Sequence, residues 1–392
     1  MNLLLITNLF PTPSDPERGI FTLQLVKRLE KICNVTVICP LPYFPKISIL
    51  KKLEKWYQFA LVPNEYIIDG IKVYSPKYPM IPKVSESNHA LLMSIGLKSS
   101  IKKLNDKYNF DAINSQWLFP DSCAVDMAIK DLNIPHIATG LGCDINQDTY
   151  HSIKGPLILQ MLNRAKAITV VSNNLKNELI NHNINSEKIT VIPNGVDINS
   201  FKIQDKDICR QRLGIKSSAP MVLYVGRLSE EKNIKSLIIA SEKLITNGKY
   251  FNLYIVGDGP LDMELKQLTR QLKIEENVHF IGKVDHSEIS TWMSSTDFFS
   301  LPSIREGCPN VILEALGCGR PVISSNVGAI PDVVNEQSGI LFDPNNIDDI
   351  ASSFIQAFSR TWDENQITNS IKHLTWENAA KKYLTVCESA KN

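Results

Sequence analysis

Short apolar runs alternate with helical patterns along almost the whole chain, and this alternation restricts the fold more than any other feature. Short apolar runs bounded by turn residues are typical of buried strands, whereas apolar residues that recur every three to four positions indicate helices. Strand–helix alternation predicts α/β units built on parallel, doubly wound sheets. We expect strands at 2–7, 34–39, 71–75, 110–114, 135–138, 166–172, 219–226, 252–256, 278–281, 297–301 and 321–324. In the first half we expect helices near 20–31, 88–104, 122–131, 156–164 and 173–182.

The 392 residues exceed the usual size of a single domain. The strand–helix pattern starts again after the segment IPNGVDINSF (192–201), which has the densest turn chemistry between the two halves. We therefore expect a first Rossmann-like domain over 1–192, a linker over 193–201, a second Rossmann-like domain over 202–374, and a closing helix within 375–392.

The composition, with 43% hydrophobic and 21% charged residues, is that of an ordinary globular protein. The eight cysteines form no Cys-x-x-Cys pair or Cys/His cluster, so we expect reduced thiols and a cytoplasmic location. The N-terminal sequence MNLLLIT lacks the basic region of a signal peptide and fits a first strand better. No apolar stretch reaches membrane-span length. We expect no nucleic-acid partner.

Charge is distributed unevenly along the chain. Residues 1–185 contain 20 Lys and Arg against 15 Asp and Glu, a net +5, whereas residues 186–392 contain 22 against 26, a net −4. The segment ISILKKLEKWY (47–57) interleaves lysines with apolar and aromatic residues, as helices at a bilayer interface do. A basic half suits peripheral contact with the anionic inner face of the cytoplasmic membrane, or a lipid-pyrophosphate acceptor. The alternatives are a chance asymmetry and a surface helix that docks on its own domain.

Two basic residues follow the strand expected at 219–225. Gly226 ends that strand, Arg227 lies where the chain leaves the sheet, and Lys232 precedes a helix expected over 233–244. A strand, a turn and a helix in this order present a helix N-terminus to an anion in doubly wound sheets. Arg supplies a rigid fork for two phosphate oxygens and Lys a compact charge, so the pair suits a diphosphate.

Two glutamates, Glu306 and Glu314, lie eight positions apart in the segment SIREGCPNVILEALGCG (303–319). Glu306 falls in the loop after the strand at 297–301, and Glu314 lies just over one turn into a helix that Pro309 opens. An ionised carboxylate is a pure acceptor, so the pair suits the hydroxyls of a sugar and a ribose. Taken alone, Glu314 would also fit a helix-dipole residue. First-turn amides expected to have no partner inside the helix belong to Asn310, Val311 and Ile312.

Together these motifs resemble the retaining glycosyltransferases of family four, which have the two-domain GT-B fold. The resemblance follows the chain in order through Ile192-Pro-Asn-Gly-Val-Asp197, Gly226-Arg227…Lys232, Gly257-Asp-Gly-Pro260 and Glu306…Glu314. The first half is similar to the branch that builds bacterial exopolysaccharide, O-antigen and teichuronic-acid-type polymers. That similarity lies in PERGIF (16–21), WLFPD (117–121) and GCDIN (142–146).

The resemblance implies two Rossmann-like domains facing each other across a cleft, with the C-terminal helix crossing back to the first. It implies retaining transfer of a hexosyl-type sugar from a nucleotide-diphosphate sugar to a saccharide or lipid-linked saccharide, in cell-surface polysaccharide synthesis. The residues implied in catalysis are Arg227, Lys232, Glu306 and Glu314. Those implied in donor binding are Gly19, Gly226, Gly257, Gly282, Cys308, Pro309, Asn310, Val311 and Ile312. Those implied on the acceptor side are Gln116, Asp144 and Asn194.

Two of these assignments have alternatives from the residues themselves. Gly19 opens a helix, where it would let a ligand approach the backbone or would simply relax a tight entry. Asp144 would orient the acceptor or cap the next helix.

We expect neither a metal nor a cofactor. Arg227, Lys232 and the helix amides would neutralise the leaving diphosphate as preorganised donors, and the Asp205-Lys-Asp207 pair lies in a polar segment where it is expected to be solvated. Relatives often have histidines at positions matching 114–117 and 139–144, and this chain has none there. The departing phosphate oxygen can take the acceptor's proton, so the mechanism does not require a protein base.

Two other functions share the nucleotide-sugar site. One is a catalytically silent nucleotide-sugar-binding partner, which the missing histidines favour and the intact Arg, Lys and Glu residues oppose. The other is a GT-B sugar-nucleotide epimerase, which would need an acid/base set that the sequence does not show. A Rossmann dehydrogenase is excluded because no Gly-x-Gly-x-x-Gly follows a strand.

Overall fold

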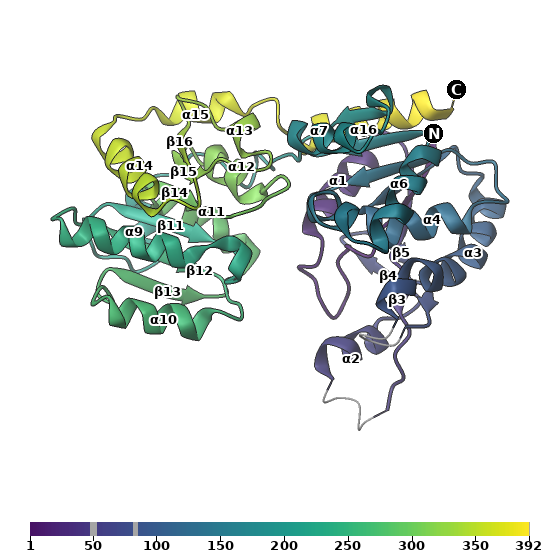
Figure 1. Cartoon of the computed structure of the whole chain (residues 1–392), viewed down its shortest axis with the longest axis horizontal. Helices are drawn as coiled ribbons and strands as arrows, with labels where there is room; N and C mark the ends of the chain where they lie inside the picture. The colour runs from purple at the N-terminus through teal and green to yellow at the C-terminus, as the bar shows by residue number, and fades with distance from the viewer. Residues whose placement is uncertain (48–52, 81–84, 392) are drawn as a thin grey trace. The chain divides into compact units, whose positions relative to one another are not determined.

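The computed structural model describes residues 1–47, 53–80 and 85–391. The chain divides into two compact units: unit 1 comprises Met1–Asn194 with the C-terminal segment from Trp376, and unit 2 comprises Gly195–Thr375. Figure 1 shows that both units are α/β, each with a sheet between helices.

Unit 1 is built on an eight-stranded sheet with the strand order β10-β9-β8-β7-β1-β2-β5-β4. All its pairings are parallel except that of the edge strand β4 with β5. The strands are β1 (Asn2–Ile6), β2 (Asn34–Ile38), β4 (Glu65–Ile68), β5 (Ile71–Tyr74), β7 (Ala112–Gln116), β8 (His136–Gly140), β9 (Ala167–Val170) and β10 (Ile189–Val191). A separate two-stranded sheet pairs β3 (Leu41–Pro42) with β6 (Lys77–Tyr78).

Most helices of unit 1 connect its strands, and the last helix of the chain returns to this unit after unit 2. The helices of unit 1 are α1 (Ile20–Leu29), α2 (Glu54–Leu61), α3 (His89–Tyr108), α4 (Cys123–Ala128), α5 (Cys143–Asn146), α6 (Lys154–Arg164), α7 (Asn173–Asn181) and α16 (Trp376–Lys391). In Figure 1 the last helix, α16, lies beside α1, and it also contacts the central strand β7. Its buried Trp376 and Tyr383 belong to the core of unit 1, so the end of the chain completes a unit that the beginning of the chain starts.

Unit 2 has a fully parallel six-stranded sheet with the order β13-β12-β11-β14-β15-β16. Its strands are β11 (Met221–Val225), β12 (Asn252–Val256), β13 (Val278–Gly282), β14 (Phe298–Leu301), β15 (Val322–Ser325) and β16 (Gly339–Phe342). Its helices are α8 (Lys206–Arg212), α9 (Ile234–Thr246), α10 (Asp262–Gln271), α11 (His286–Ser295), α12 (Asn310–Gly317), α13 (Ile330–Val333), α14 (Ile347–Ser359) and α15 (Glu364–Ser370). Because both faces of the sheet are covered, every residue of β11, β12, β14 and β15 is buried, as expected for apolar strand runs without alternation.

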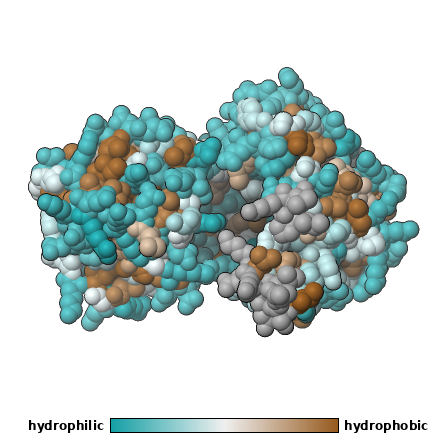
Figure 2. All heavy atoms as spheres, turned by 60° about the horizontal axis from the view of Figure 1, so that its bottom comes forward, coloured by the Kyte–Doolittle hydropathy of each residue, from teal (hydrophilic) through white to brown (hydrophobic). Residues whose placement is uncertain are grey.

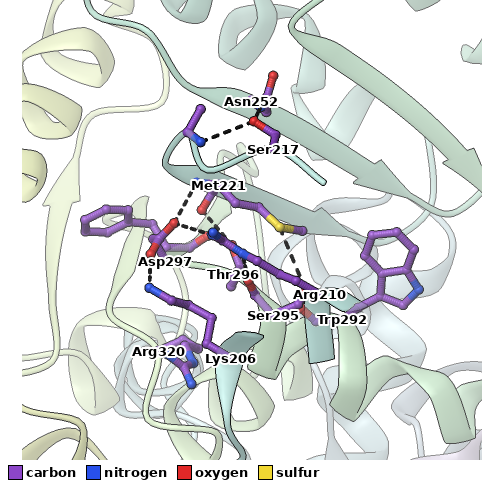
Figure 3. A network of polar contacts seen from close by, with 12 residues as sticks. Lys206, Arg210, Ser217, Met221, Asn252, Trp292, Ser295, Thr296, Asp297 and Arg320 are labelled. Atoms are coloured by element: carbon purple, nitrogen blue, oxygen red, sulfur yellow. Dashed lines mark hydrogen bonds and ion pairs between the residues drawn. The ribbon is translucent and has the colours of Figure 1, made fainter. Parts of the chain in front are cut away.

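A polar network fixes α8 at the N-terminal edge of this sheet (Figure 3). The Asp297 carboxylate lies 2.6 Å from both Lys206 Nζ and Arg210 Nη2, and it accepts a hydrogen bond from the Met221 N–H at 2.7 Å. Burial would raise the pKa of Asp297, but the Lys206 and Met221 hydrogen bonds outweigh it and the pKa is lowered. Asp205 caps α8 by accepting from the Ile208 N–H at 2.9 Å. Asp205 and Asp207 are both exposed, as expected, and the Asp205 carboxylate also caps the helix.

The segment expected as a linker, 193–201, contributes two side chains to the core of unit 2, while Ile198, Asn199 and Ser200 are exposed. Val196 and Phe201 are buried in the unit 2 core, and Val196 pairs with Thr375 in a parallel bridge. The turn residues of this segment thus alternate with Val196 and Phe201, whose burial the turn signals alone did not predict. The chain thus passes from one unit to the other after Asn194 and returns after Thr375.

The segment 47–57, interpreted as an amphipathic surface helix, lies partly outside the described residues. The structure shows α2 over Glu54–Leu61, while residues 48–52 lie outside the description. None of the described helices combines the length and the apolar composition needed to cross a bilayer.

Candidate active site

In unit 2 the candidate residues follow two neighbouring strands at the point where the connections diverge. The chain continues from β11 towards β12 on one side, and β14 lies on the other side of β11. Such a switch point opens a crevice at the carboxyl ends of parallel strands, where doubly wound sheets bind ligands. The loop after β11 contains Arg227 and Lys232, and the loop after β14 contains Glu306.

Three glycines end neighbouring strands at this edge. The Gly226 N–H donates to the Val256 carbonyl at 3.0 Å, and the Gly257 N–H donates to the Gly282 carbonyl at 2.8 Å. A Cβ on Gly257 would come within 2.0 Å of the Gly226 carbonyl oxygen, so the close approach of the two loops requires a glycine there. Gly282, in contrast, has a φ of +80° and open space on its Cβ side. Internal packing therefore explains Gly257 fully, whereas at Gly282 the structure leaves room for a ligand.

Lys232 and Glu306 form an ion pair across the switch point. Lys232 Nζ lies 2.6 Å from Glu306 Oε1, and the hydroxyl of the buried Ser303 donates to the same oxygen at 2.6 Å. The Glu306 side chain is only 10% exposed. The sequence placed these two residues at one edge, but their direct contact could not be read from it.

Arg227 differs from Lys232 in its environment. Its side chain is exposed, and within the described parts of the chain its guanidinium forms no hydrogen bond or ion pair. Its backbone is fixed, because the buried Tyr224 hydroxyl donates to the Arg227 carbonyl at 2.9 Å. The fork of this arginine is thus available to an anion, while its position at the strand end is held by the core.

Helix α12 begins at Asn310, with Pro309 at the N-cap position. The Ile312 N–H donates to the Pro309 carbonyl at 3.1 Å, so a hydrogen bond to the N-cap residue, just outside the helix, satisfies this first-turn amide. Its cause is the extended backbone of Pro309 (ψ 112°), which directs the carbonyl into the first turn. The roles of the Asn310, Val311 and Ile312 amides as anion donors stay predictions. Cys308 is half-buried and packs against the unit 2 core.

Glu314 is the fifth residue of α12, and its side chain is 12% exposed. Burial raises the pKa of its carboxyl to about 7. The neighbouring titratable group is His286, whose Nε2 lies 3.9 Å from Glu314 Oε1. Of the two glutamates, Glu306 therefore has a lysine partner at hydrogen-bond distance, whereas Glu314 is a desolvated acid beside a histidine.

In unit 1 a buried carboxylate ties together the loops at its own switch point, between β1 and β7. Asp121 accepts hydrogen bonds from both the backbone N–H and the side-chain amide of Asn8, the latter at 2.8 Å. Burial raises the pKa of Asp121 to about 8, although the Asn8 hydrogen bond opposes this. Gly19, the N-cap of α1, lies so close to the loop that a Cβ would meet the Leu9 carbonyl oxygen at 2.1 Å. This contact explains the glycine without a ligand, and its role at the donor diphosphate stays a prediction.

Asp144 organises loops and does not cap α5. Its carboxylate accepts from the backbone N–H groups of Leu118 at 2.9 Å and Gly142 at 2.7 Å, and also from Leu141. It is fully buried, which raises its pKa to about 6. Gln116 is also buried and donates to Asn114 Oδ1 at 2.6 Å. The acceptor-side assignments of Gln116, Asp144 and the half-buried Asn194 stay predictions.

Sequence reasoning missed three side chains that hold this machinery in place. Ser303 and Tyr224 hold Glu306 and Arg227 in unit 2, and Asp121 holds the loop after β1 in unit 1. Asp121 belongs to the motif WLFPD (117–121) and Ser303 to the segment 303–319, but the sequence suggested no role for either. Their signal is a polar residue at the end of a strand whose partner lies in another loop. Among the described residues no group of three or more His, Cys, Asp or Glu side chains could hold a metal ion.

Comparison with known families gives the same division of the chain. Residues 19–200 match the family model described as Glycosyltransferase Family 4, and residues 205–374 match that described as Glycosyl transferases group 1. A putative teichuronic acid biosynthesis glycosyltransferase of Bacillus subtilis is 30% identical over 362 residues, covering 90% of this chain and 88% of the relative. A UDP-Gal:alpha-D-GlcNAc-diphosphoundecaprenol alpha-1,3-galactosyltransferase of Escherichia coli is 36% identical over 183 residues, 45% of this chain and 46% of the relative.

Solved structures agree on the fold. Sucrose-phosphate synthase from Thermosynechococcus elongatus superimposes with a TM-score of 0.77 at 18% identity, covering 99% of this chain and 98% of the other. Anabaena HepE in complex with UDP gives a TM-score of 0.69 at 21% identity, covering 99% and 97%. With its two doubly wound units, its returning C-terminal helix and its family matches, this chain belongs to the family four, group 1 glycosyltransferases and has the GT-B fold.

Proposed function

We propose that this glycosyltransferase transfers a hexosyl-type sugar, with retention of configuration, from a nucleotide-diphosphate sugar to a hydroxyl of a lipid-linked saccharide during cell-surface polysaccharide synthesis. The observation that supports the donor assignment most strongly is the Lys232–Glu306 pair beside the exposed Arg227, at the switch point of unit 2. The Anabaena relative in fold was solved with UDP and with UDP-glucose, which supports a donor of this class.

The donor would use three parts of this edge. Arg227 and the remaining N–H donors of Lys232 would bind the diphosphate, and the Asn310 and Val311 amides would add uncharged donors. Glu306 would accept a hydrogen bond from a hydroxyl of the sugar. Glu314 would accept the ribose hydroxyls in its ionised form. Because the Arg227 backbone and the Lys232 side chain are held in place before the reaction, these donors would stabilise the charge that develops on the leaving diphosphate without a metal.

Retention through a leaving-group-assisted step agrees with the state of the buried acids in unit 1. Asp121 and Asp144 both accept several N–H hydrogen bonds, so both are occupied in holding loops. A departing diphosphate oxygen would then take the proton from the acceptor hydroxyl. The C–O bond to the phosphate breaks as the new C–O bond forms on the same face of the sugar.

A lipid-linked acceptor agrees with relatives whose names specify lipid or lipid-linked substrates, among them the diphosphoundecaprenol galactosyltransferase of Escherichia coli. It also agrees with the net +5 of residues 1–185 and with exposed apolar side chains around α2 and the segment before it: Tyr43, Ile47, Leu53 and Leu61. On the face shown in Figure 2, however, apolar side chains form small separate patches among hydrophilic ones. We therefore propose that any peripheral contact with an anionic membrane is weak and depends on salt concentration.

The test is a panel of UDP-, GDP- and CMP-linked sugars, assayed for slow donor hydrolysis and thermal stabilisation with EDTA present. We expect one donor to be hydrolysed and to raise the Tm, and we expect Glu306→Gln to abolish hydrolysis. Lys243→Ala provides the control, because Lys243 forms a 2.6 Å ion pair with the exposed Asp348, away from the switch point. Stabilisation without hydrolysis or transfer would instead support a silent nucleotide-sugar-binding partner, and complete dependence on a divalent ion would overturn the metal-free mechanism.

A further inference from the structure

His286, which the proposed donor machinery does not use, lies beside Glu314. It is the first residue of α11, and its Nε2 is 3.9 Å from Glu314 Oε1. This separation is too long for a hydrogen bond but is within the range of an ion pair. The His286 side chain is 45% exposed, whereas that of Glu314 is 12% exposed. The buried carboxylate thus has a solvent-accessible imidazole next to it.

The imidazole is held by packing against a buried aromatic ring. The rings of Phe201 and His286 meet edge to face, with centroids 6.0 Å apart and planes at 83°. Phe201 is itself 4% exposed, and its backbone packs on α12, because a Cβ on Gly317 would lie 3.0 Å from the Phe201 carbonyl oxygen. Phe201 therefore contacts both the histidine and the helix that contains Glu314, and it fixes the distance between them.

Few other charges act on Glu314. From α11 the facing group is His286, and on α12 itself Cys318 lies one turn further on, with a thiol whose raised pKa keeps it neutral. On the side of α15, Arg320 and Glu364 form an ion pair with each other at 2.6 Å. Since burial alone raises the pKa of Glu314 to about 7, a proton on the neighbouring imidazole would favour the carboxylate form.

We propose that His286 is a positioning residue of the nucleotide site, which keeps the Glu314 carboxylate ionised and oriented to accept the ribose hydroxyls of the donor. The inference rests on the proposed donor site, and it assigns to His286 the control of the contact between Glu314 and the ribose. A protonated carboxyl accepts hydrogen bonds only weakly and has an O–H group that donates one. It is therefore a poor partner for two ribose hydroxyls that both donate. His286 extends the range of pH over which the acceptor form is present.

The sign of the pH dependence follows from these states. Nucleotide affinity is present above the pKa of Glu314 and is lost as the pH falls through it. Where burial alone sets the pKa of Glu314 near 7, as expected without the histidine, affinity falls about tenfold between pH 8 and pH 6. Removing His286 removes the group that favours the carboxylate when it carries a proton, so the midpoint of the curve moves to higher pH.

The experiment measures the Kd of the full chain for UDP, GDP and CDP, each alone, by calorimetric titration from pH 5.5 to 9. For the nucleotide that binds, we expect His286→Ala to weaken binding about threefold or more near pH 7, and the two curves to converge by pH 9. We expect His286→Lys, which places a permanent cation beside Glu314, to flatten the curve. The 2′-deoxy form of the same nucleotide should bind less tightly and show a smaller difference between wild type and variant.

His279→Gln is the matched control. His279 is another histidine of unit 2; it lies on β13, and its ring packs on that of Tyr254 with ring centroids 4.6 Å apart. It should leave the pH profile unchanged. A His286→Ala curve that superimposes on wild type, or that is lower by the same factor at every pH, overturns the inference while leaving the donor site intact. Wild type that binds none of the three nucleotides at any pH overturns the donor assignment, and the role of His286 with it.

Discussion

The ammonium group of Lys232 has three N–H donors, and the structure directs one of them to Glu306. Arg227, only five positions earlier in the chain, keeps its guanidinium exposed. The two cations are therefore not equivalent. Lys232 neutralises a nearly buried acid and, in the proposed site, would also bind the diphosphate, whereas Arg227 would bind the diphosphate alone. Replacing each should separate these two effects.

We predict that Arg227→Ala lowers the transfer rate by about a hundred- to thousandfold, the usual cost of losing one preorganised donor at a developing anion, with little change in Tm. Lys232→Ala should lower the rate as strongly and should also destabilise unit 2 by about 1–3 kcal/mol, because Glu306 is left without its cation. Steady-state transfer and thermal unfolding of both variants measure this. Arg270→Ala, on the exposed last turn of α10, is the control. Transfer within a few-fold of wild type in Arg227→Ala would refute its assignment.

At the scale of elements, the strands were predictable where both faces of a sheet are covered. The apolar runs at 2–7 and 252–256 correspond to β1 and β12, because buried parallel strands need continuous hydrophobic residues. The edge strands β4, β10 and β16 were not predicted, since only one of four, one of three and two of four of their residues are buried. Helix boundaries agreed within a few residues wherever apolar spacing defined them, as for α9 and α12.

The sequence predicted which loops hold the candidate site residues, but it did not predict which side chains contact each other. Strand ends placed Arg227, Lys232 and Glu306 at one edge, because parallel strands share their carboxyl ends. The contact between Lys232 and Glu306 depends on β14 lying next to β11, which no local pattern encodes. The partner of the Ile312 amide depends on the backbone angle of Pro309, and the neighbourhood of His286 depends on how α11 packs on α12.

The Asp297 network gives a prediction at this scale, because one carboxylate connects α8 to two strands. Asp297→Asn should destabilise unit 2 by about 2–3 kcal/mol at pH 7, since Arg210 and Lys206 would lose their partner. The folded-state pKa of Asp297 is lowered, so its stabilisation is present above its ordinary pKa and is lost as the pH falls through the folded value. Unfolding measured by calorimetry should thus show a difference from wild type that shrinks below about pH 4.

Asp348→Asn is the matched control for that measurement. Asp348 also forms a 2.6 Å ion pair, with Lys243, but its side chain is 81% exposed. Its loss should change stability by less than about 1 kcal/mol. Equal effects of the two substitutions would show that Asp297 does not anchor α8.

At the scale of the whole molecule, unit 2 is continuous in sequence and unit 1 is not. The two ends of unit 2 meet, because Val196 pairs with Thr375 and its N–H donates to the Leu374 carbonyl at 2.9 Å. Unit 1, in contrast, needs the last helix for its core, where α16 buries Trp376, Ala380 and Tyr383. The two units should therefore respond differently to being expressed alone.

We predict that the fragment 195–375 folds cooperatively by itself and retains nucleotide binding. The fragment 1–194 should be unstable, because loss of Trp376 and Tyr383 alone removes at least about 4 kcal/mol of apolar burial from a unit of marginal stability. Circular dichroism melts of both fragments measure this, and joining 376–392 to residue 194 through a short glycine-rich linker should restore unit 1. A fragment 1–194 as stable as the linked form would contradict the prediction.

Because both passages between the units lie within one backbone hydrogen bond of each other, unit 2, the proposed donor half, is inserted at a single place in the sequence of unit 1, the proposed acceptor half. A recombination event with both junctions at this place exchanges the complete donor half and cuts neither hydrophobic core. Related chains could in this way acquire a new activated sugar in one step while keeping their acceptor half, and an engineer could make the same exchange at Asn194 and Thr375.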